Sequence, residues 1–229
     1  MSAQIVTLVR HGQAQHNVDE AYHIHDAVLT PLGESQCCTI PARFPADPPI
    51  NLLVTSPLRR AIQTTLIGFA PAVAAGVPII ALPALQETSV APCDTGSPAA
   101  ALMADPRLAA NIDYTLCHDG WMDKTGDNAA EPEALTRRAR QARAWLRART
   151  EAHVVAVLHG GFLHYLTEDW TGHDDHPGTG WENTEFRSYT WAPGEADTLV
   201  ETKESRERRA DKPLGKTEMM EFVETHAKN

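Results

Sequence analysis

Two short apolar runs end in residues that can bind and attack a phosphate group. Ile5–Val9 leads into Arg10 and His11, and the apolar run that begins at His153 leads into His159. An arginine guanidinium matches the oxygens of phosphate, and a neutral imidazole can attack phosphorus. Cations gathered in one crevice repel each other until an anion such as phosphate is bound. These residue types predict phosphoryl-transfer chemistry at the two junctions.

One more cation and one carboxyl group fit the same chemistry. Arg60 lies close to the start of an expected helix, and Glu87 lies in a stretch, 76–91, that has no other charged residue. Burial would remove water from an isolated carboxyl group and raise its pKa, so Glu87 could donate a proton to the leaving alkoxide. The predicted catalytic set comprises a nucleophile, three phosphate ligands and a proton donor: His11, Arg10, Arg60, His159 and Glu87.

Alternating strands and helices are expected to hold these residues. The sequence predicts strands at 4–9, 50–55, 78–82 and 153–158, and helices that begin near Pro31, Pro57, Pro132 and Phe162. The carboxyl ends of parallel strands meet at one edge of an open α/β sheet, so the catalytic set should gather there. We expect a single α/β domain over 1–229, with a terminal hairpin at 186–202 and a charged C-terminal segment at 203–229.

Proline residues mark the expected helix starts. Thr30 and Ser56 each precede a proline, which predicts that their side chains cap the following helices. The second cap would place Arg59 and Arg60 in the first helical turn, and we expect Arg59 to face solvent without a partner. In the helix from Pro132, apolar residues recur at spacings of three and four, which predicts that its arginines lie on the solvent face.

A long segment at 88–133 is rich in Pro, Gly, Asp and Ala and has no sustained periodicity. Such an insertion between regular elements is usually a lid or a pocket wall. Arg107 and Lys124 are its only basic residues, against eight acidic ones. A substrate that carries a second phosphate or a carboxylate favours basic residues in the pocket wall. The acidic composition therefore predicts a small substrate with few negative charges outside the reacting phosphate.

The composition of the 229-residue chain argues against several classes of partner. A net charge of -10 disfavours nucleic acid and anionic membrane surfaces, and no apolar run approaches the ~20 residues of a membrane span. The four cysteines lack metal-ligand spacing, and the N-terminus lacks the pattern of a signal peptide. We expect a cytoplasmic protein that needs no metal ion or cofactor and binds neither nucleic acid nor a membrane. No pattern indicates an oligomeric state.

The order and spacing of these motifs resemble those of the histidine phosphatase superfamily, in its phosphoglycerate mutase-like, phosphatase-type branch. The matching pieces are RHG at 10–12, TPLG at 30–33, SPLRRA at 56–61, Glu87, and HG at 159–160. The resemblance implies a three-layer α/β/α sandwich with a mostly parallel central sheet, and a phosphohistidine intermediate on His11. It also implies further substrate or phosphate contacts from Asn17, Gly160, Gln13, Cys93 and Asp94.

The resulting prediction is a phosphomonoesterase that acts on a small phosphorylated metabolite and releases inorganic phosphate. Phosphoryl transfer of the phosphoglycerate mutase type is one alternative. A second alternative is a non-hydrolytic acid–base enzyme that catalyses a dehydration or isomerisation with Glu87 and the histidines. A third is a non-catalytic binding protein that keeps the fold, although the whole predicted catalytic set is present in the chain.

Overall fold

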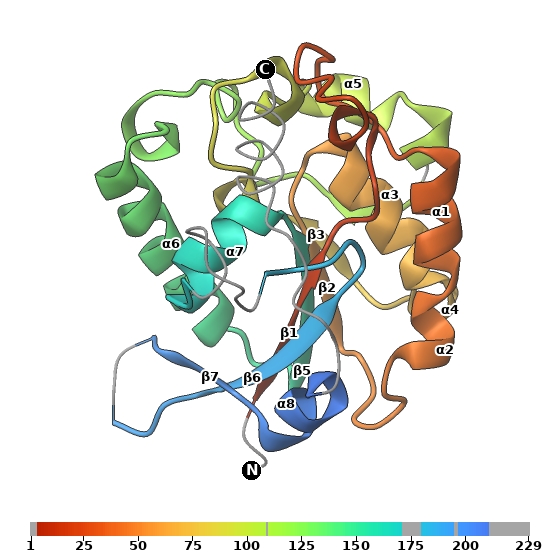
Figure 1. Ribbon diagram of the computed structural model, residues 1–229, viewed down its shortest axis with the longest axis vertical. Coiled ribbons are helices and arrows are strands. Elements are labelled where there is room, and N and C mark those ends of the chain that lie inside the picture. The colour runs from red at the N-terminus through yellow and green to blue at the C-terminus, as the bar shows by residue number, and fades with distance from the viewer. Residues whose placement is uncertain (1–3, 109, 171–179, 195–196, 211–229) are drawn as a thin grey trace.

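The computed structural model of the protein describes residues 4–108, 110–170, 180–194 and 197–210. Its centre is a seven-stranded sheet in the order β4-β3-β2-β5-β1-β6-β7 (Figure 1). The strands are β1 Ile5–Arg10, β2 Leu52–Thr55, β3 Ile79–Ala81, β4 Ile112–Asp113, β5 His153–Leu158, β6 Phe186–Trp191 and β7 Leu199–Glu201. The pairs from β4 to β1 are parallel, whereas β6 is antiparallel to both β1 and β7. The predicted mostly parallel sheet is confirmed.

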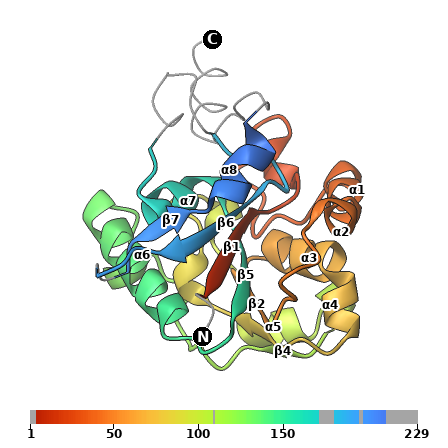
Figure 2. The same cartoon turned by 90° about the horizontal axis from the view of Figure 1, so that it is seen from below.

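Helices cover both faces of the sheet, which gives the three-layer arrangement. They are α1 Pro31–Cys38, α2 Ile40–Arg43, α3 Arg59–Gly68, α4 Ala70–Ala74, α5 Ala99–Met103, α6 Pro132–Arg147, α7 Gly160–Thr167 and α8 Lys203–Arg209. Helices α6 and α7 lie on one face, and α1 to α4 lie on the other (Figures 1 and 2). The charged segment begins with α8, where the Ser205 hydroxyl accepts a hydrogen bond from the Ser188 amide of β6 at 3.0 Å.

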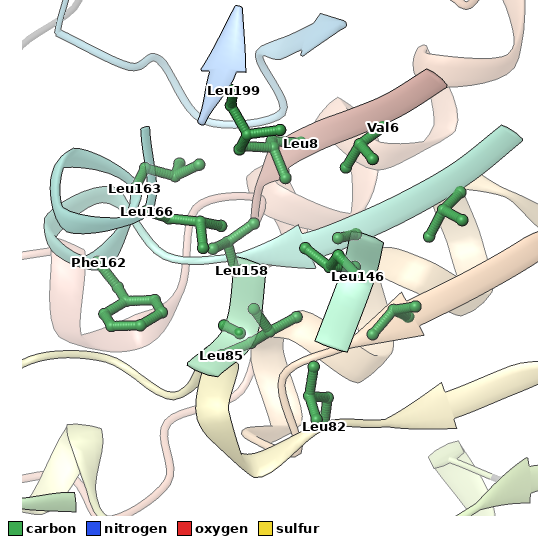
Figure 3. Packing of buried hydrophobic residues seen from close by; sticks show 14 of the residues in the cluster. Val6, Leu8, Leu82, Leu85, Leu146, Leu158, Phe162, Leu163, Leu166 and Leu199 are labelled. Carbon is green, nitrogen blue, oxygen red and sulfur yellow. The ribbon is translucent and has the colours of Figure 1, made fainter. Parts of the chain in front are cut away.

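The hydrophobic core lies on both sides of the sheet. On the α6 and α7 side, Leu8 and Leu158 belong to one cluster with Leu146 and Phe162 (Figure 3). On the other side, Val9 packs in a second cluster that includes residues of α3. Because both faces are covered, the central strands are continuous apolar runs rather than alternating ones. The predicted apolar stripe of α6 is buried: Leu135, Ala139, Ala142 and Leu146.

The two predicted helix caps have different outcomes. Thr30 caps α1 as predicted, because its hydroxyl accepts a hydrogen bond from the Gly33 amide at 3.0 Å. The prediction for Ser56 is wrong, since α3 begins at Arg59 with Leu58 as its N-cap residue and no side-chain cap. The Ser56 hydroxyl instead lies 2.8 Å from His159 Nε2. A side chain that can cap a helix is thus used to hold an imidazole.

The segment at 88–133 contains more regular structure than the sequence predicted. The sequence also predicts a short helix near residues 98–104, and α5 is present there. The two-residue strand β4 was not predicted, and it extends the sheet by pairing in parallel with β3. A strand this short leaves too little periodicity in the sequence to be recognised. The sequence also predicts a loop at 173–180 and a helix at 218–226, and apart from Gly180 both ranges lie outside the described residues.

Within the described part of the chain, no helix has the length and apolar character needed to cross a membrane.

A buried histidine lies at the end of the sheet opposite to the predicted catalytic residues. His153, the first residue of β5, has Nδ1 at 2.9 Å from the Pro48 carbonyl and Nε2 at 3.0 Å from the Thr7 hydroxyl. Because a carbonyl can only accept, Nδ1 carries the proton of the neutral ring and Nε2 accepts from Thr7. Burial lowers the pKa of His153 below its ordinary value of 6.5.

This shift predicts how His153 affects stability at low pH. The unfolded chain binds the proton more readily than the folded chain, so His153 should make the free energy of unfolding fall as the pH drops through about 6.5. We expect His153→Gln to show a smaller loss of stability than the wild type in urea unfolding between about pH 7 and about pH 5. His118→Gln, at an exposed position, should keep the wild-type slope. A wild-type slope in His153→Gln would contradict the assignment.

Candidate active site

The two predicted histidine junctions meet at one edge of the sheet. Arg10 ends β1 and pairs in register with Leu158, the last residue of β5. The next residues, His11 and His159, therefore lie side by side, with ring centroids 5.1 Å apart and both side chains fully buried. Parallel neighbouring strands thus produce the proximity that the sequence predicted.

The hydrogen bonds of His11 define its tautomer. Nδ1 lies 2.6 Å from the carbonyl oxygen of Gly12, which can only accept, so Nδ1 carries a proton. The other ring nitrogen, Nε2, accepts a hydrogen bond from Nε of Arg60 at 3.2 Å. Both contacts place the lone pair of the neutral imidazole on Nε2, facing the Arg60 guanidinium. An imidazole in this state can attack an electrophilic phosphorus atom.

Arg60 is fully buried in the first turn of α3 and is held at three nitrogens. Besides the contact with His11, Nη1 donates to the carbonyl of Cys93 at 2.6 Å and Nη2 donates to the Asp94 carboxylate at 2.8 Å. Cys93 and Asp94 end the short 3-10 helix Pro92–Asp94 of the insertion. The sequence predicted that these two residues contact the substrate. The structure shows that they position Arg60.

Glu87 is buried, with a side chain that reaches the start of α7. Its Oε1 accepts hydrogen bonds from the amides of Phe162 and Thr88, both at 2.9 Å, and its Oε2 accepts one from Gly161 at 3.1 Å. The sequence predicted the burial, and the 2 % exposure of Glu87 agrees. It did not predict the amide donors, which favour the ionised carboxylate and so oppose the effect of burial.

Arg138 of α6 also lies next to Glu87, although the sequence did not predict it as a residue of the site. Its guanidinium lies 4.4 Å from the ring centroid of Phe162, and Nη2 donates to the Glu87 carbonyl at 3.0 Å. Burial lowers the pKa of Arg138 to about 10, and the negative charges of Glu87 and Asp94 oppose this shift. The prediction that the arginines of α6 face solvent is therefore wrong for Arg138, which is buried. Arg138 follows Leu135 by three positions, so it lies on the buried stripe of the helix.

Asn17 acts on the site through a histidine that the sequence did not single out. Its Oδ1 accepts a hydrogen bond from the Ala14 amide at 2.9 Å, which orients Nδ2 as the donor to His16 Nε2 at 3.1 Å. His16 therefore carries its proton on Nδ1 when neutral. The buried His16 ring lies 5.7 Å from that of His11. Asn17 thus positions His16 in this structure.

Gln13 connects the catalytic turn to α1. Its Oε1 accepts a hydrogen bond from the Thr30 hydroxyl at 2.8 Å, and its backbone N–H donates to Oε1 of Gln36 at 2.9 Å. A Cβ added to Gly33 would lie 2.0 Å from the Gln13 carbonyl oxygen, so only glycine permits this approach of helix and turn. These contacts explain the TPLG motif as a support for the turn after β1. The predicted contact of Gln13 with phosphate stays a prediction.

Arg59 has partners, contrary to the prediction. Its side chain forms ion pairs with Asp26, at 3.4 Å between Nε and Oδ2, and with Asp105 of the insertion. Asp26 also accepts a hydrogen bond from the Ser97 hydroxyl at 2.7 Å. Burial raises the pKa of Asp26, an effect that the Ser97 and Arg59 contacts oppose. This network joins the loop before α1, the start of α3 and the insertion.

The acidic residues of the insertion are mostly exposed or paired with arginines, and the acidic pocket wall stays a prediction. Asp105 pairs with Arg59 and Arg107, and Asp127 pairs with Arg137 on an exposed surface. The remaining acidic residues other than Asp94 are exposed: Asp113, Asp119, Asp123, Glu131 and Glu133. Lys124 is half-buried and interacts electrostatically with Glu87, Asp94, Arg60 and Arg138. Lys124 thus lies within electrostatic range of the site, and most acids of the insertion are exposed.

This arrangement matches a known family. A model described as "Histidine phosphatase superfamily (branch 1)" matches residues 6–202 of the sequence. The chain belongs to the histidine phosphatase superfamily. A Schizosaccharomyces pombe protein named "Probable phosphatase" is 34% identical over 118 residues, which are 50% of this chain and 53% of that protein. The matched part therefore spans about half the length of this relative.

Solved structures of other histidine phosphatase-like proteins share the fold. The alpha-ribazole phosphatase of Shigella flexneri gives a TM-score of 0.57 at 19% identity, covering 87% of this chain and 95% of that one. The phosphoserine phosphatase of Entamoeba histolytica, in complex with 3-phosphoglyceric acid, gives a TM-score of 0.53 at 18% identity. The latter covers 95% of this chain and 99% of that one. At these identities the similarity establishes the architecture.

In this histidine phosphatase, the described ranges of the chain bring together no group of three His, Cys, Asp or Glu side chains that could hold a metal ion. Independence of metal ions stays a prediction.

Gly160 allows the Arg10 guanidinium to approach the backbone of α7. A Cβ added to Gly160 would lie 3.2 Å from Arg10 Nε. We expect Gly160→Ala to displace the guanidinium and to raise the inhibition constant of inorganic phosphate by about 3- to 10-fold, with little change in stability. The matched variant Gly161→Ala would crowd Glu87 instead and should leave that constant within about twofold. Equal effects of the two variants would contradict this assignment.

Proposed function

We propose that this histidine phosphatase hydrolyses a small phosphomonoester through a phosphohistidine on Nε2 of His11. The observation that carries the proposal is the tautomer of His11, whose Nδ1–H donates to Gly12 and whose Nε2 lone pair faces Arg60. The names of the relatives, which include phosphatases for phosphoserine and alpha-ribazole phosphate, support hydrolysis of a phosphoester as the reaction class.

In the first step, a phosphoryl group bound among the cations is attacked by His11. The guanidiniums of Arg10 and Arg60, together with His159, stabilise the three equatorial oxygens as negative charge shifts. The bond from Nε2 to phosphorus forms while the bond from phosphorus to the ester oxygen breaks. Glu87 in its neutral form gives its proton to the leaving oxygen, and the alcohol departs.

In the second step, the same groups release phosphate. The Glu87 carboxylate, stabilised by the amides of Gly161 and Phe162, takes a proton from a water molecule. The oxygen of this water attacks phosphorus, and the bond to Nε2 breaks. Inorganic phosphate leaves, His11 regains its lone pair, and Glu87 is again protonated. The cycle therefore needs water as its only co-substrate.

The direct test is hydrolysis of p-nitrophenyl phosphate in buffer that contains EDTA. We expect nitrophenol and inorganic phosphate to be released in equal amounts, with no loss of rate caused by the chelator. Transfer of the phosphoryl group to an added alcohol such as 3-phosphoglycerate, in place of release as phosphate, would favour a mutase. Failure to release either product would overturn the proposed function.

A further inference from the structure

The peptide bond between His11 and Gly12 lies just beyond the end of a strand. Strand β1 ends at Arg10, and the His11 amide still donates to the Leu158 carbonyl of β5 at 3.0 Å. The chain then leaves the sheet, although both His11 and Gly12 are buried. A buried backbone N–H or carbonyl that lacks a partner is costly. The polar groups of this peptide therefore need hydrogen bonds from outside the pairing of β1 with β5.

The hydroxyl of Thr64, in α3, binds the N–H end of this peptide. The Gly12 N–H donates to Thr64 Oγ1 at 3.0 Å, and the same hydroxyl donates to the Arg60 carbonyl at 2.7 Å. Because a carbonyl can only accept, the hydroxyl proton lies toward Arg60 and an oxygen lone pair faces Gly12. The fully buried Thr64 side chain thus joins the turn after β1 to the helical turn that carries Arg60.

The side chain of Asn183 binds the carbonyl end of the same peptide. Asn183 Nδ2 donates to the His11 carbonyl at 3.0 Å. The backbone amide of Thr184 is shared between this oxygen, at 3.3 Å, and the Arg10 carbonyl, at 3.1 Å. Both residues belong to the turn just before β6, which begins at Phe186. Two segments that are far apart in the sequence therefore hold one peptide at its two ends.

The orientation of this peptide affects where the His11 ring lies. Nδ1 of the ring donates to the carbonyl of Gly12 at 2.6 Å, so the imidazole is bonded to the residue whose N–H is held by Thr64. Rotation of the peptide would move the Gly12 carbonyl away from Nδ1 and turn Nε2 away from Arg60. A displacement of about 1 Å at a reacting atom can slow a reaction by about 100-fold.

We propose that Thr64 and Asn183 are positioning residues that act together, through the His11–Gly12 peptide, to hold the imidazole in its attacking orientation. This inference rests on the proposed function, because it takes His11 as the nucleophile. Neither residue needs to touch the substrate in this role. Removal of either group should therefore slow the attack on phosphorus and leave the binding of phosphate almost unchanged.

Two substitutions of Thr64 separate its hydroxyl from its packing. Thr64→Val keeps the shape, and we expect it to lower kcat/KM for p-nitrophenyl phosphate by about 30-fold, with the inhibition constant of inorganic phosphate within about threefold of the wild type. Thr64→Ser keeps the hydroxyl and should retain kcat/KM within about threefold, although it loses a buried methyl group. Thr65→Val is the matched control, because it removes a buried hydroxyl that donates to the Ala61 carbonyl at 2.9 Å in the same helix. Its kcat/KM should equal that of the wild type.

Asn183→Ala tests the other end of the peptide. It should lower kcat/KM by about 5-fold, less than Thr64→Val, because the Thr184 amide still reaches the His11 carbonyl. The double variant Thr64→Val/Asn183→Ala should lose about as much as Thr64→Val alone, since either change already releases the shared peptide. Asn111→Ala, at an exposed position just before β4, is the control and should keep wild-type activity.

The ring N–H of His11 provides a readout that does not depend on turnover. In protein labelled with ¹⁵N, a buried imidazole N–H bonded to the Gly12 carbonyl should exchange slowly with water and give a resolved signal. Its absence in His11→Asn would assign it. We expect the signal to persist in Thr64→Ser and Thr65→Val, and to be broadened or lost by exchange in Thr64→Val and in Asn183→Ala.

Several outcomes would overturn the inference. An unchanged kcat/KM and N–H signal in Thr64→Val, an equal loss of kcat/KM in Thr64→Ser, or a double variant that loses the full product of the single effects would each exclude positioning through this peptide. If Thr64→Val does not fold, the activity and N–H signal of Asn183→Ala decide. Absence of p-nitrophenyl phosphate hydrolysis in the wild type would overturn the proposed function, and the N–H signals would still show whether these residues hold His11. Hydrolysis that depends on His11, combined with wild-type kcat/KM in Thr64→Val, would overturn this inference alone.

Discussion

His11→Asn is expected to lower kcat for p-nitrophenyl phosphate by about 10⁴-fold or more. The substitution removes the nitrogen lone pair that faces Arg60 and leaves a polar side chain of similar size in the buried position. The remaining cations can still bind phosphate, so the KM should change much less than kcat. This pattern would separate loss of the nucleophile from loss of the binding site.

Covalent trapping gives the accompanying measurement. The wild type, mixed with a radiolabelled phosphoester and quenched in base, should carry label on His11, because phosphohistidine is stable in alkali and labile in acid. His11→Asn should carry none, and the exposed control His118→Asn should be labelled like the wild type. Retained turnover without label in His11→Asn would contradict a phosphohistidine intermediate on His11.

Glu87→Gln is expected to show an effect that depends on the leaving group. An alkoxide needs a proton to depart, so turnover of glycerol 3-phosphate should fall by about 10²- to 10⁴-fold. Nitrophenolate is a stable anion, so the burst of nitrophenol from the first step should persist with p-nitrophenyl phosphate. Its steady-state rate should still fall, because hydrolysis of phosphohistidine needs the Glu87 carboxylate.

Rapid-mixing measurements of the burst and of the steady-state rate for both esters distinguish these steps. Glu133→Gln, an exposed glutamate at the start of α6, is the matched control and should behave as the wild type. Equal loss of the burst with both esters would exclude Glu87 as the proton donor. Such a result would assign it a role in holding the first turn of α7.

The sequence was sufficient to predict the positions of the residues at the strand ends. Arg10, His11 and His159 directly follow or end long buried strands, and parallel pairing of β1 with β5 brings them together. Arg60 was predicted for a similar reason, since its helix leaves β2 at the same edge of the sheet. Apolar runs and turn residues are strong local signals, and the topology of a parallel sheet converts them into a shared location.

The direction of isolated charged side chains could not be predicted in the same way. The charge count over 88–133 predicted an acidic pocket wall, because composition does not show that Asp105 and Asp127 form ion pairs with arginines. Lys124 turns inward through contacts with Gln86, a residue far from it in the sequence. The burial of Arg138 could have been predicted, since the helical spacing from Leu135 places it on the buried stripe of α6.

The position of β5 between β1 and β2 has a consequence for how the chain folds during synthesis. Strand β5 begins at residue 153, so β1 and β2 lack their shared partner until residues 153–158 have been made. Pairing across such a sequence separation is slow, and the open edges of β1 and β2 can pair with other chains in the meantime. The phosphate site cannot form on a nascent chain that ends before His159. Pairing of β5 with β1 and β2 should therefore complete the phosphate site and cover the open strand edges in the same late step.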